Sequence, residues 1–521
     1  MVNESERLKL ATLPRWLGFA ALCIGMAMAI LDIQVVVTSL PVIEKALDIG
    51  ADQMSWIQTS YLIAEVIAIP LTGLLTRVFT LRRLLVAALL CFTLASVACA
   101  GSSNFMELLV ARSIQGFAGG ILIPIVFSAI FILFPPGLEQ SFATTMAGFL
   151  AVLAPTLGPL IGGWLTDHYS WHWLFLINVL PGIFAICAGY SALPKQKLRP
   201  DELKTLDWLS LTLLAVGLAA LLIGLKDAPR DGWLNPIVLF WFALAAVSLF
   251  WLWRRPNPAI MFHLLEDRSL AFGCILSFII GFVLYANIYL IPVFMAFVRN
   301  HTPLEIGICT LVMGLSQLLT APLSVQIDRW FNARILAALG FGAFAIGLFM
   351  NGFLTINSDY DAYFWPQVVR GVASAFCVLP PIRFALALMP LDKVGDASGL
   401  FNVSRNIGGA LGIAVVDTMM FSRQPFYADL FLDWMKTAPD KAAAVLQIPV
   451  GDIPASNDAS GFMGILDLVQ SAALTSAINE SWMLLGAVCL LALPAIWLLG
   501  PVTSALPARK LAAMRQNGQT R

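Results

Sequence analysis

The chain has 521 residues, of which 59% are hydrophobic and 12% are charged, with a formal net charge of zero. A soluble protein of this size needs far less apolar surface. The composition therefore excludes that class and predicts a helical protein that crosses a membrane many times. The balanced charge gives no indication of a nucleic-acid partner.

About fourteen apolar segments, each long enough to cross a hydrocarbon core of about 30 Å, follow one another along the chain. The first follows a short charged N-terminus and is too long for the apolar region of a cleaved signal peptide. The expected spans are residues 16–40, 54–76, 84–101, 105–132, 141–165, 171–193, 205–225, 233–253, 269–297, 303–327, 333–354, 362–389, 397–421 and 480–501.

These spans group into three parts. Residues 1–193 are expected to form an N-terminal six-helix bundle, 194–256 a basic linker with two extra spans, and 257–521 a C-terminal six-helix bundle. Within the last part, 422–479 is the one long segment outside the membrane. We interpret it as a solvated extracytoplasmic loop with a short interfacial helix near 462–474, or as a docking surface for a partner.

Lysine and arginine are distributed unequally between the two sides of the expected spans. Most of those outside the spans lie on the side that carries both termini. Because positive residues collect on the cytoplasmic side, both termini are expected in the cytoplasm and the protein in the cytoplasmic (inner) membrane.

Two prolines and three glycines lie close together in the fifth expected span: Pro155, Gly158, Pro159, Gly162 and Gly163. A soluble helix would not tolerate this composition, whereas in a membrane neighbouring helices cover the freed backbone groups. Gly158 and Gly162 share one bare face that lets another helix approach closely. Taken alone, the pattern indicates a packing groove as readily as a functional motif.

The segment 154–163 resembles the antiporter signature of the major facilitator superfamily. Residues 171–182 and 31–41 resemble the sixth and first spans of its 14-span drug:proton antiporters, the EmrB/QacA type. The resemblance implies an all-α polytopic major facilitator fold, with two six-helix bundles and two extra central spans. It also implies proton-coupled multidrug efflux, with the glycine-proline face of the fifth span sealing against the other half.

Two short segments suggest that the halves are copies of one unit. Residues 112–116 read Arg-Ser-Ile-Gln-Gly, and residues 367–371 read Gln-Val-Val-Arg-Gly. Arginine and glutamine have exchanged places before a shared glycine, and a proline follows about two turns later in each. A duplicated transporter fold binds its substrate near mid-membrane between the halves.

Placing a charged side chain inside a membrane span costs free energy, so such residues usually face the bundle interior and belong to a functional pathway. Asp32, Glu65 and Arg112 come from three spans and are expected at similar depth. One interpretation is a structural Asp32–Arg112 ion pair with Glu65 hydrogen-bonded. The other is a proton site in which Asp32 or Glu65 exchanges the proton and Arg112 tunes it. The family resemblance favours the second and implies an acid at Asp32 and a coupling arginine at Arg112. It leads us to expect a neutral residue at position 65.

The cavity is expected to be apolar with a few polar groups, which suits hydrophobic or amphipathic compounds. Arg383 and Arg405 lie in the inner half with no acid expected at their level. They could bind backbone carbonyls, lipid phosphate or an anionic substrate group, and the structural interpretation is favoured. The predicted cavity residues are Gln34, Gln115, Asn287, Gln367, Arg370, Asn402, Arg405 and Asn406.

The loop after the second span resembles the superfamily's loop signature only in part. Arg77 and Thr80 stand where the signature has an aspartate and a second glycine. The residues that fit are Gly73, Arg82 and Arg83 here, and Asp328 and Arg329 in the equivalent loop after the tenth span.

The sequence contains no phosphate-binding loop, nucleophile elbow or metal-ligand spacing, so we expect a transporter without cofactor or metal and no enzyme. The expected partners are a small hydrophobic substrate, protons and membrane lipid, with a periplasmic adaptor and an outer-membrane channel as a further option. Two alternatives stay open. They are an exporter of a specific organic or fatty acid on the same fold, and a membrane scaffold of an efflux complex.

Overall fold

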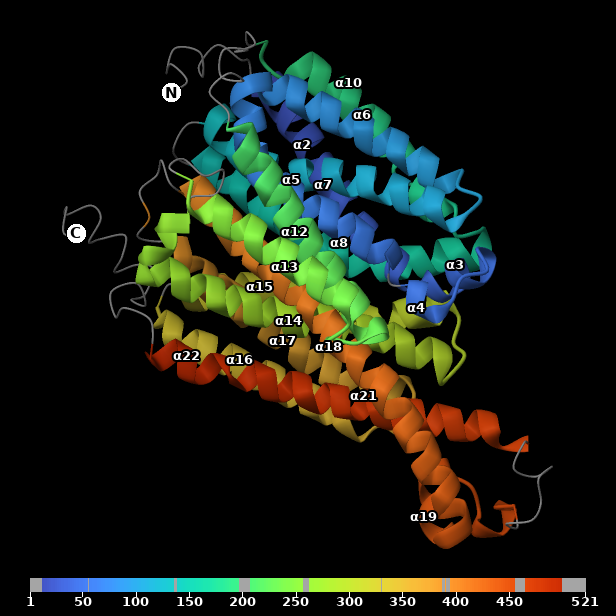
Figure 1. The fold of residues 1–521 in the computed structure, drawn as a ribbon. Coiled ribbons are helices and arrows are strands. Elements are labelled where there is room, and N and C mark those ends of the chain that lie inside the picture. The colour runs from blue at the N-terminus through green and yellow to red at the C-terminus, as the bar shows by residue number, and fades with distance from the viewer. Residues whose placement is uncertain are drawn as a thin grey trace.

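The computed structural model describes residues 12–54, 56–134, 138–195, 207–255, 262–328, 330–386, 389, 394–454 and 464–498 (Figure 1). Every regular element in these ranges is a helix, which confirms the all-α prediction. Twelve helices of this part of the chain are long and apolar enough to cross a membrane.

Two further helices occupy the second and twelfth expected spans, α5 (Trp56–Phe79) and α17 (Tyr360–Leu386). The apolar stretch of α5 covers only Trp56–Thr72. Helix α17 contains an aspartate, two arginines and three prolines, which lower its hydropathy. The count of fourteen spans is compatible with these helices and stays a prediction.

The N-terminal bundle occupies one side of the molecule, blue to teal in Figure 1. Helix α2 packs against α7, α8 and α10, and α5 packs along α7. Its long helices are α2 (Thr12–Val37), α5, α6 (Leu81–Ala100), α7 (Phe105–Leu133), α8 (Leu138–His168) and α10 (Val179–Ala192). Short helices α3 (Leu40–Ala46), α4 (Ala51–Met54) and α9 (Trp173–Leu176) lie in its connections.

The C-terminal bundle repeats this arrangement, with α14 packed along α18 and α15 along α17. Its long helices are α14 (Arg268–Phe297), α15 (Pro303–Asp328), α16 (Ala333–Met350), α17, α18 (Val394–Thr437) and α21 (Leu466–Leu490), which α22 (Ala492–Leu498) follows. Its short elements are η1 (Phe262–Glu266), η2 (Asn351–Phe353), α19 (Pro439–Leu446) and η3 (Val450–Asp452).

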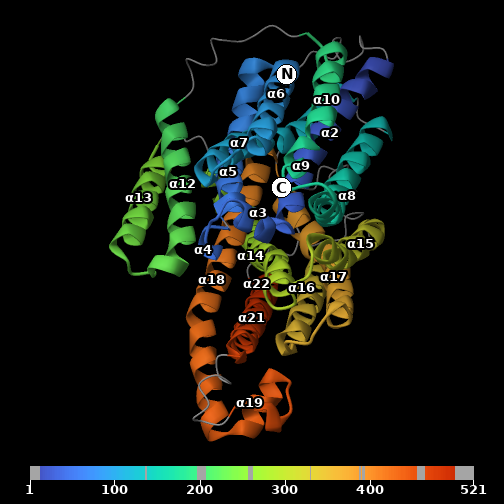
Figure 2. The ribbon, with the colours of Figure 1, turned by 90° about the vertical axis from the view of Figure 1, so that its right-hand side faces the viewer.

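The two extra helices, α12 (Trp208–Asp231) and α13 (Pro236–Trp253), form a hairpin on the flank of the molecule (Figure 2). Helix α12 packs against both α5 and α18, one from each half. The hairpin ends are tied by an ion pair of 2.7 Å between Arg255 and Asp207. Hydrogen bonds from Ser210 and Arg255 lower the pKa of the Asp207 carboxyl to about 2.

Lys226 directly follows the seventh expected span, 205–225, but the structure places it inside a helix. Its side chain is buried within α12 and lies 3.9 Å from the carboxylate of Asp417 on α18. The hydropathy pattern could not show this contact, because the two residues are far apart in the sequence.

The last two long helices extend well past their expected ends. Helix α18 continues to Thr437 where the span was expected to end at 421, and α21 begins at Leu466 where 480 was expected. Both helices project with α19 beyond the bundle (Figure 1). Arg423 and Tyr427 of α18 bond to Glu480 of α21 within 2.7 Å. Phe431 of the extended α18 is buried in the same apolar cluster as Val469 of α21, so polar and apolar contacts together support the projecting helices. Residues 455–463, which include the first two residues of the expected interfacial helix, lie outside the described residues, and its remainder from Leu466 onward is the start of α21.

Thr80 has a φ of +72° at the start of α6, a backbone region that favours glycine. This is the position where the superfamily's loop signature has its second glycine, so the structure keeps the turn although the residue differs. Its hydroxyl is buried without a hydrogen-bond partner.

We expect Thr80→Gly to raise the free energy of unfolding by about 1 kcal/mol, because strain of this kind costs about 1–3 kcal/mol and glycine recovers only part of it. The measurement is thermal unfolding of the purified protein. Thr76→Gly, inside α5, is the control and should lower stability. A lower stability of Thr80→Gly would contradict the strain argument.

Gly162 of α8 provides a second test of the packing, since a Cβ atom there would meet the backbone of Val35 on α2. We expect Gly162→Leu to destabilise the N-terminal bundle by about 1–3 kcal/mol, the usual cost of overpacking. Gly148 in the same helix supplies the matched control, because a Cβ atom there would meet nothing within 4 Å. Equal melting temperatures for the two leucine variants would be incompatible with this close approach.

Candidate proton-coupling site

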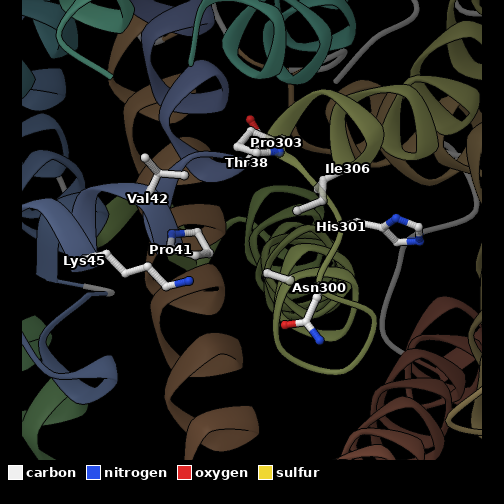
Figure 3. Close-up of a pocket in the computed structure, with 9 residues that line it drawn as sticks. Thr38, Pro41, Val42, Lys45, Asn300, His301, Pro303 and Ile306 are labelled. Carbon is white, nitrogen blue, oxygen red and sulfur yellow. The ribbon is translucent and has the colours of Figure 1, made fainter. Parts of the chain in front are cut away.

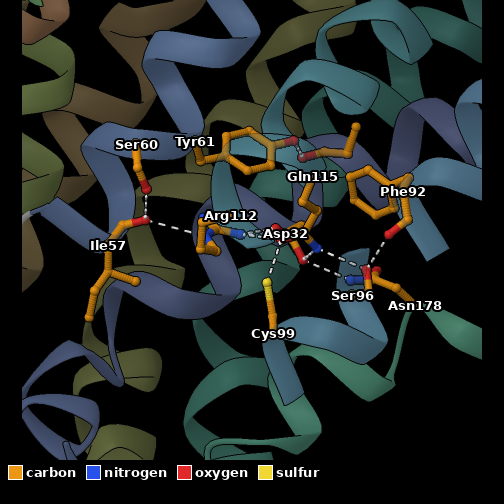
Figure 4. Close-up of polar contacts among 11 residues, drawn as sticks. Asp32, Ile57, Ser60, Tyr61, Phe92, Ser96, Cys99, Arg112, Gln115 and Asn178 are labelled. Carbon is orange, nitrogen blue, oxygen red and sulfur yellow. Dashed lines mark hydrogen bonds and ion pairs between the residues drawn. The ribbon is translucent and has the colours of Figure 1, made fainter. Parts of the chain in front are cut away.

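Asp32 is fully buried in the N-terminal bundle, and both of its carboxylate oxygens accept hydrogen bonds (Figure 4). Arg112 Nη1 on α7 donates to Oδ2. Oδ1 accepts from Gln115 Nε2 at 2.8 Å and from Asn178 Nδ2 at 2.7 Å. We call these four residues the Asp32 network. The sequence predicted Asp32 and Arg112 as partners, and the structure brings them together.

Asn178 is the member that sequence reasoning missed. It lies between α9 and α10, in the segment that resembles the sixth span of the antiporters. That resemblance placed it in a family motif but assigned it no partner. Only the fold shows that this amide reaches the Asp32 carboxylate from a third part of the chain.

Arg112 is held by more than its counter-ion. Its Nε donates to the carbonyl oxygen of Ile57 at 3.2 Å, and its Nη1 also donates to Gln115 Oε1 at 2.8 Å. The guanidinium lies over the ring of Tyr61, 4.4 Å from the ring centre. Four contacts therefore fix this side chain, so the charge is positioned as well as compensated.

Gln115, predicted as a cavity residue, lies fully buried inside this network. Its Nε2 donates to Ser96 Oγ at 2.9 Å in addition to Asp32. It thereby links α7 to α6 and orients the carboxylate.

Glu65 on α5 makes no hydrogen bond to the Asp32 network among the described residues. It is 4% exposed, and its Oε2 atom has no hydrogen-bond partner. Arg405 on α18, and after it Arg112, are the cations that act on its charge. Glu65 therefore experiences a positive group from each half of the molecule.

The predicted cavity residues do not gather around one space. Asn402 accepts a hydrogen bond from Arg405 Nη2 at 2.9 Å, and Asn406 accepts one from the hydroxyl of Tyr285 at 3.3 Å. Asn287 and Gln367 are buried within the C-terminal bundle, where their amides bond to Met313 Sδ at 3.5 Å and to the Cys309 carbonyl at 2.7 Å. Arg370 is buried there too, and Gln34 packs in the N-terminal bundle against Gly158.

Two cavities lie between the halves. The larger, of about 190 Å³, opens where α2 and α3 approach the connection between α14 and α15 (Figure 3), and Lys45 and His301 line it. The smaller, of about 20 Å³, lies between α5, α12 and α18, and Asn406, Lys226 and Asp417 line it. Of the predicted cavity residues, Asn406 alone lines either of these two cavities.

The expected seal of α8 against the other half is present, and its partner is α15. A Cβ atom at Gly163 would meet the backbone of Pro303 and Leu304, and one at Gly307 would meet the carbonyl of Pro159. Asp167 at the end of α8 accepts a hydrogen bond from the backbone N–H of Leu304 at 3.1 Å.

Gly158 and Gly162 have a different role from the expected one. Their bare positions face Gln34 and Val35 of α2, which belongs to the same half. Successive residues of a helix point in different directions, so Gly163 faces α15 while its neighbour faces α2. The signature therefore builds two packing faces on one helix.

Arg383 was expected without an acid at its level, and the structure corrects this. Its Nη1 lies 3.1 Å from the carboxylate of Asp328 and donates to the Asp328 carbonyl at 2.9 Å. Asp328 had been placed in the loop after the tenth span, but it ends α15 with its side chain turned inward.

The remaining loop residues lie near the same end of the bundles. Arg82 is largely buried and stacks over the ring of Tyr190 at 4.1 Å, while Arg83 is exposed. Gly73 lies within α5, and Arg329 lies outside the described residues. The described residues contain no group of three or more His, Cys, Asp or Glu side chains that could hold a metal ion.

The comparisons with known proteins agree with this architecture. The family model described as Major Facilitator Superfamily matches residues 22–413. Colistin resistance protein EmrB of Acinetobacter baumannii is 37% identical over 410 residues, which cover 78% of this chain and 80% of that protein. The chain therefore belongs to the major facilitator superfamily.

Other relatives match over nearly the whole length. Multidrug export protein EmrB of Escherichia coli is 26% identical, covering 92% of this chain and 94% of its own. Fatty acid resistance protein FarB of Neisseria gonorrhoeae is 27% identical, covering 93% and 96%. The crystal structure of a D-xylose-proton symporter, 14% identical, matches with a TM-score of 0.60 over 94% of this chain and 99% of that one, which shows the shared fold.

Removing the Asp32 charge tests the network. We expect Asp32→Asn to destabilise the protein by about 3–5 kcal/mol, because it leaves the guanidinium of Arg112 buried without a counter-ion. Thermal unfolding measures this loss. The double variant with Arg112→Gln should recover part of it, and Ser96→Ala, which removes one neutral contact of Gln115, should cost about 1 kcal/mol. Wild-type stability of Asp32→Asn would show that the pair carries little electrostatic energy.

Proposed function

We propose that the chain is a proton-coupled antiporter, and no enzyme, that exports hydrophobic or amphipathic compounds across the cytoplasmic membrane. The EmrB relatives support the export of drugs by their printed names. The observation that carries the proton coupling is the pair of buried acids with unlike surroundings. Asp32 has every oxygen bonded, whereas Glu65 has a carboxylate oxygen without a partner.

This difference assigns the two acids different tasks. A proton on Asp32 would compete with Arg112 at Oδ2, or with Gln115 and Asn178 at Oδ1, and would remove the counter-charge of Arg112, so Asp32 serves to hold Arg112 in place. Glu65 can take up a proton without losing a hydrogen bond at its free oxygen. We assign the exchanging proton to Glu65 and the orienting role to Asp32, Arg112, Gln115 and Asn178.

The position of Glu65 also suggests how the proton changes the conformation. When ionised, Glu65 on α5 attracts Arg405 on α18 and favours the approach of the two halves on that side. When protonated, it no longer attracts Arg405, and the halves can separate there while α8 and α15 remain packed. A proton thus biases two arrangements of the bundles, as alternating access requires.

Orientation and partners complete the proposal. The excess of lysine and arginine on the side of the termini supports a cytoplasmic location for both ends. The projecting ends of α18 and α21, with α19, would then lie outside the membrane on the opposite side. We propose that the projecting ends of α18 and α21, together with α19, bind a periplasmic adaptor in a cell that has two membranes.

A second candidate function is the export of a fatty acid or a related organic anion. The similarity to a fatty acid resistance protein favours it. Arg405 adds a physical reason, since its Nε is buried without a partner and could bind a carboxylate near Glu65.

Purified protein in proteoliposomes under an imposed pH gradient tests the proposal against cationic, neutral and anionic compounds. We expect the gradient to drive substrate movement. Glu65→Gln should abolish the coupling of substrate and proton flux while substrate binding persists. Glu107→Gln, an acid at the exposed start of α7, is the matched control and should leave coupling unchanged.

Each outcome has a definite meaning. Coupled export by Glu65→Gln would remove Glu65 from the proton path. Gradient-independent movement of every compound by the wild type would reject antiport altogether. Transport of fatty acids without that of cationic drugs would favour the second candidate.

A further inference from the structure

A positively charged side chain is fully buried in the C-terminal bundle, far along the chain from the Asp32 network. Arg370 on α17 has no exposed surface, and its side chain passes close to Gly347 on α16. Its guanidinium lies over the ring of Trp482 on α21, 4.8 Å from the ring centre. Three helices of one half therefore enclose this cation.

No carboxylate in the described part of the chain compensates this charge. None of the three guanidinium nitrogens of Arg370 has a hydrogen-bond acceptor there. The titratable side chains that act on it are Tyr363 and Cys309, which are both neutral at physiological pH. A cation in a low-dielectric interior is strongly unfavourable without a counter-charge, as the pairing of Arg112 with Asp32 illustrates.

The internal repeat explains how the charge came to be unpaired. In the N-terminal half, Arg112 bonds to the carbonyl of Ile57; in the C-terminal half, Gln367 bonds to the carbonyl of Cys309 in the same way. The glycine that follows meets the backbone of the neighbouring helix in both halves. Arg370 therefore occupies the place of Gln115, where the first half has a neutral amide.

Neutral donors accompany the cation. Tyr363, Gln367 and Arg370 are spaced four and three residues apart, so they share one face of α17. The hydroxyl of Tyr363 and the indole N–H of Trp482 are both buried without a partner. Arg370 contributes a charge and several N–H groups, so the set is rich in donors. Its unpartnered acceptors are the side-chain oxygen of Gln367 and the hydroxyl oxygen of Tyr363, which is also a donor.

We propose that Arg370, Tyr363 and Trp482 bind a small monovalent inorganic anion, such as chloride, inside the C-terminal bundle. One positive charge is balanced by one negative charge, and the phenol and indole donors complete its coordination. Neither of the two cavities described above is lined by these residues, so the anion site is separate from both of them. The anion neutralises this half as Asp32 neutralises the other.

Purified full-length protein in detergent tests the site without any transport assay. Thermal unfolding is followed in sodium chloride and in sodium gluconate at constant ionic strength, and radioactive chloride binding gives the stoichiometry. We expect saturable stabilisation by chloride and by bromide, with one anion bound per chain.

Variants locate the anion. Arg370→Gln should abolish the chloride dependence. Tyr363→Phe and Trp482→Phe each remove one donor and should weaken chloride affinity several-fold, while Tyr363→Phe melts in gluconate like the wild type. The matched controls are Tyr360→Phe and Trp365→Phe, exposed positions on the same helix, which should keep wild-type affinity.

Two results would overturn the proposal. The first is a melting temperature that does not depend on chloride, as expected if Gln367 and the donors satisfy one another. The second is an unchanged chloride response in Tyr363→Phe and Trp482→Phe, which would place the anion elsewhere. Because no substrate or gradient is involved, neither result bears on the proposed antiport.

Discussion

The structure depends on one constraint: a charge inside a membrane bundle must be compensated where it lies. The Asp32 network meets this constraint with an ion pair and two amides that converge from different helices. Such an arrangement is stabilising only while every partner is present, because removal of one leaves a desolvated charge. Compensation therefore also fixes the relative positions of α2, α7 and the start of α10.

Close packing at glycines makes the helices around these charges rigid. Gly158 and Gly162 bring α8 against α2 within one half, and Gly163 brings it against α15 of the other. Close backbone approach leaves little room for side-chain rearrangement, so α8 and α2 form a rigid pair within the N-terminal half. In the proposed mechanism, a change of charge at Glu65 would therefore act on packed helices and not on single side chains.

The sequence predicted well what depends on local composition. The long apolar helices and the closeness of Asp32 to Arg112 follow from hydropathy and helix rise, and the packing of α8 against the other half follows from the family resemblance. It did not predict contacts between residues distant along the chain, such as Lys226 with Asp417 or Arg383 with Asp328. Hydropathy also marks where apolar residues end and not where a helix ends, which is why α18 is longer than expected.

Buried charges are compensated differently in the two halves, and this difference supports the proposed coupling of a proton to the arrangement of the bundles. The N-terminal half holds the balanced Asp32–Arg112 pair, so this pair contributes the same charge in either arrangement of the bundles. In the C-terminal half, Arg405 donates to Asn402 and has no carboxylate partner within hydrogen-bonding distance among the described residues. The proton that we propose for Glu65 would then change its attraction to Arg405 of the other half. In this mechanism one proton on Glu65 changes the electrostatic attraction between the halves. If the charges within each half were fully compensated, protonation would not favour a different arrangement of the bundles.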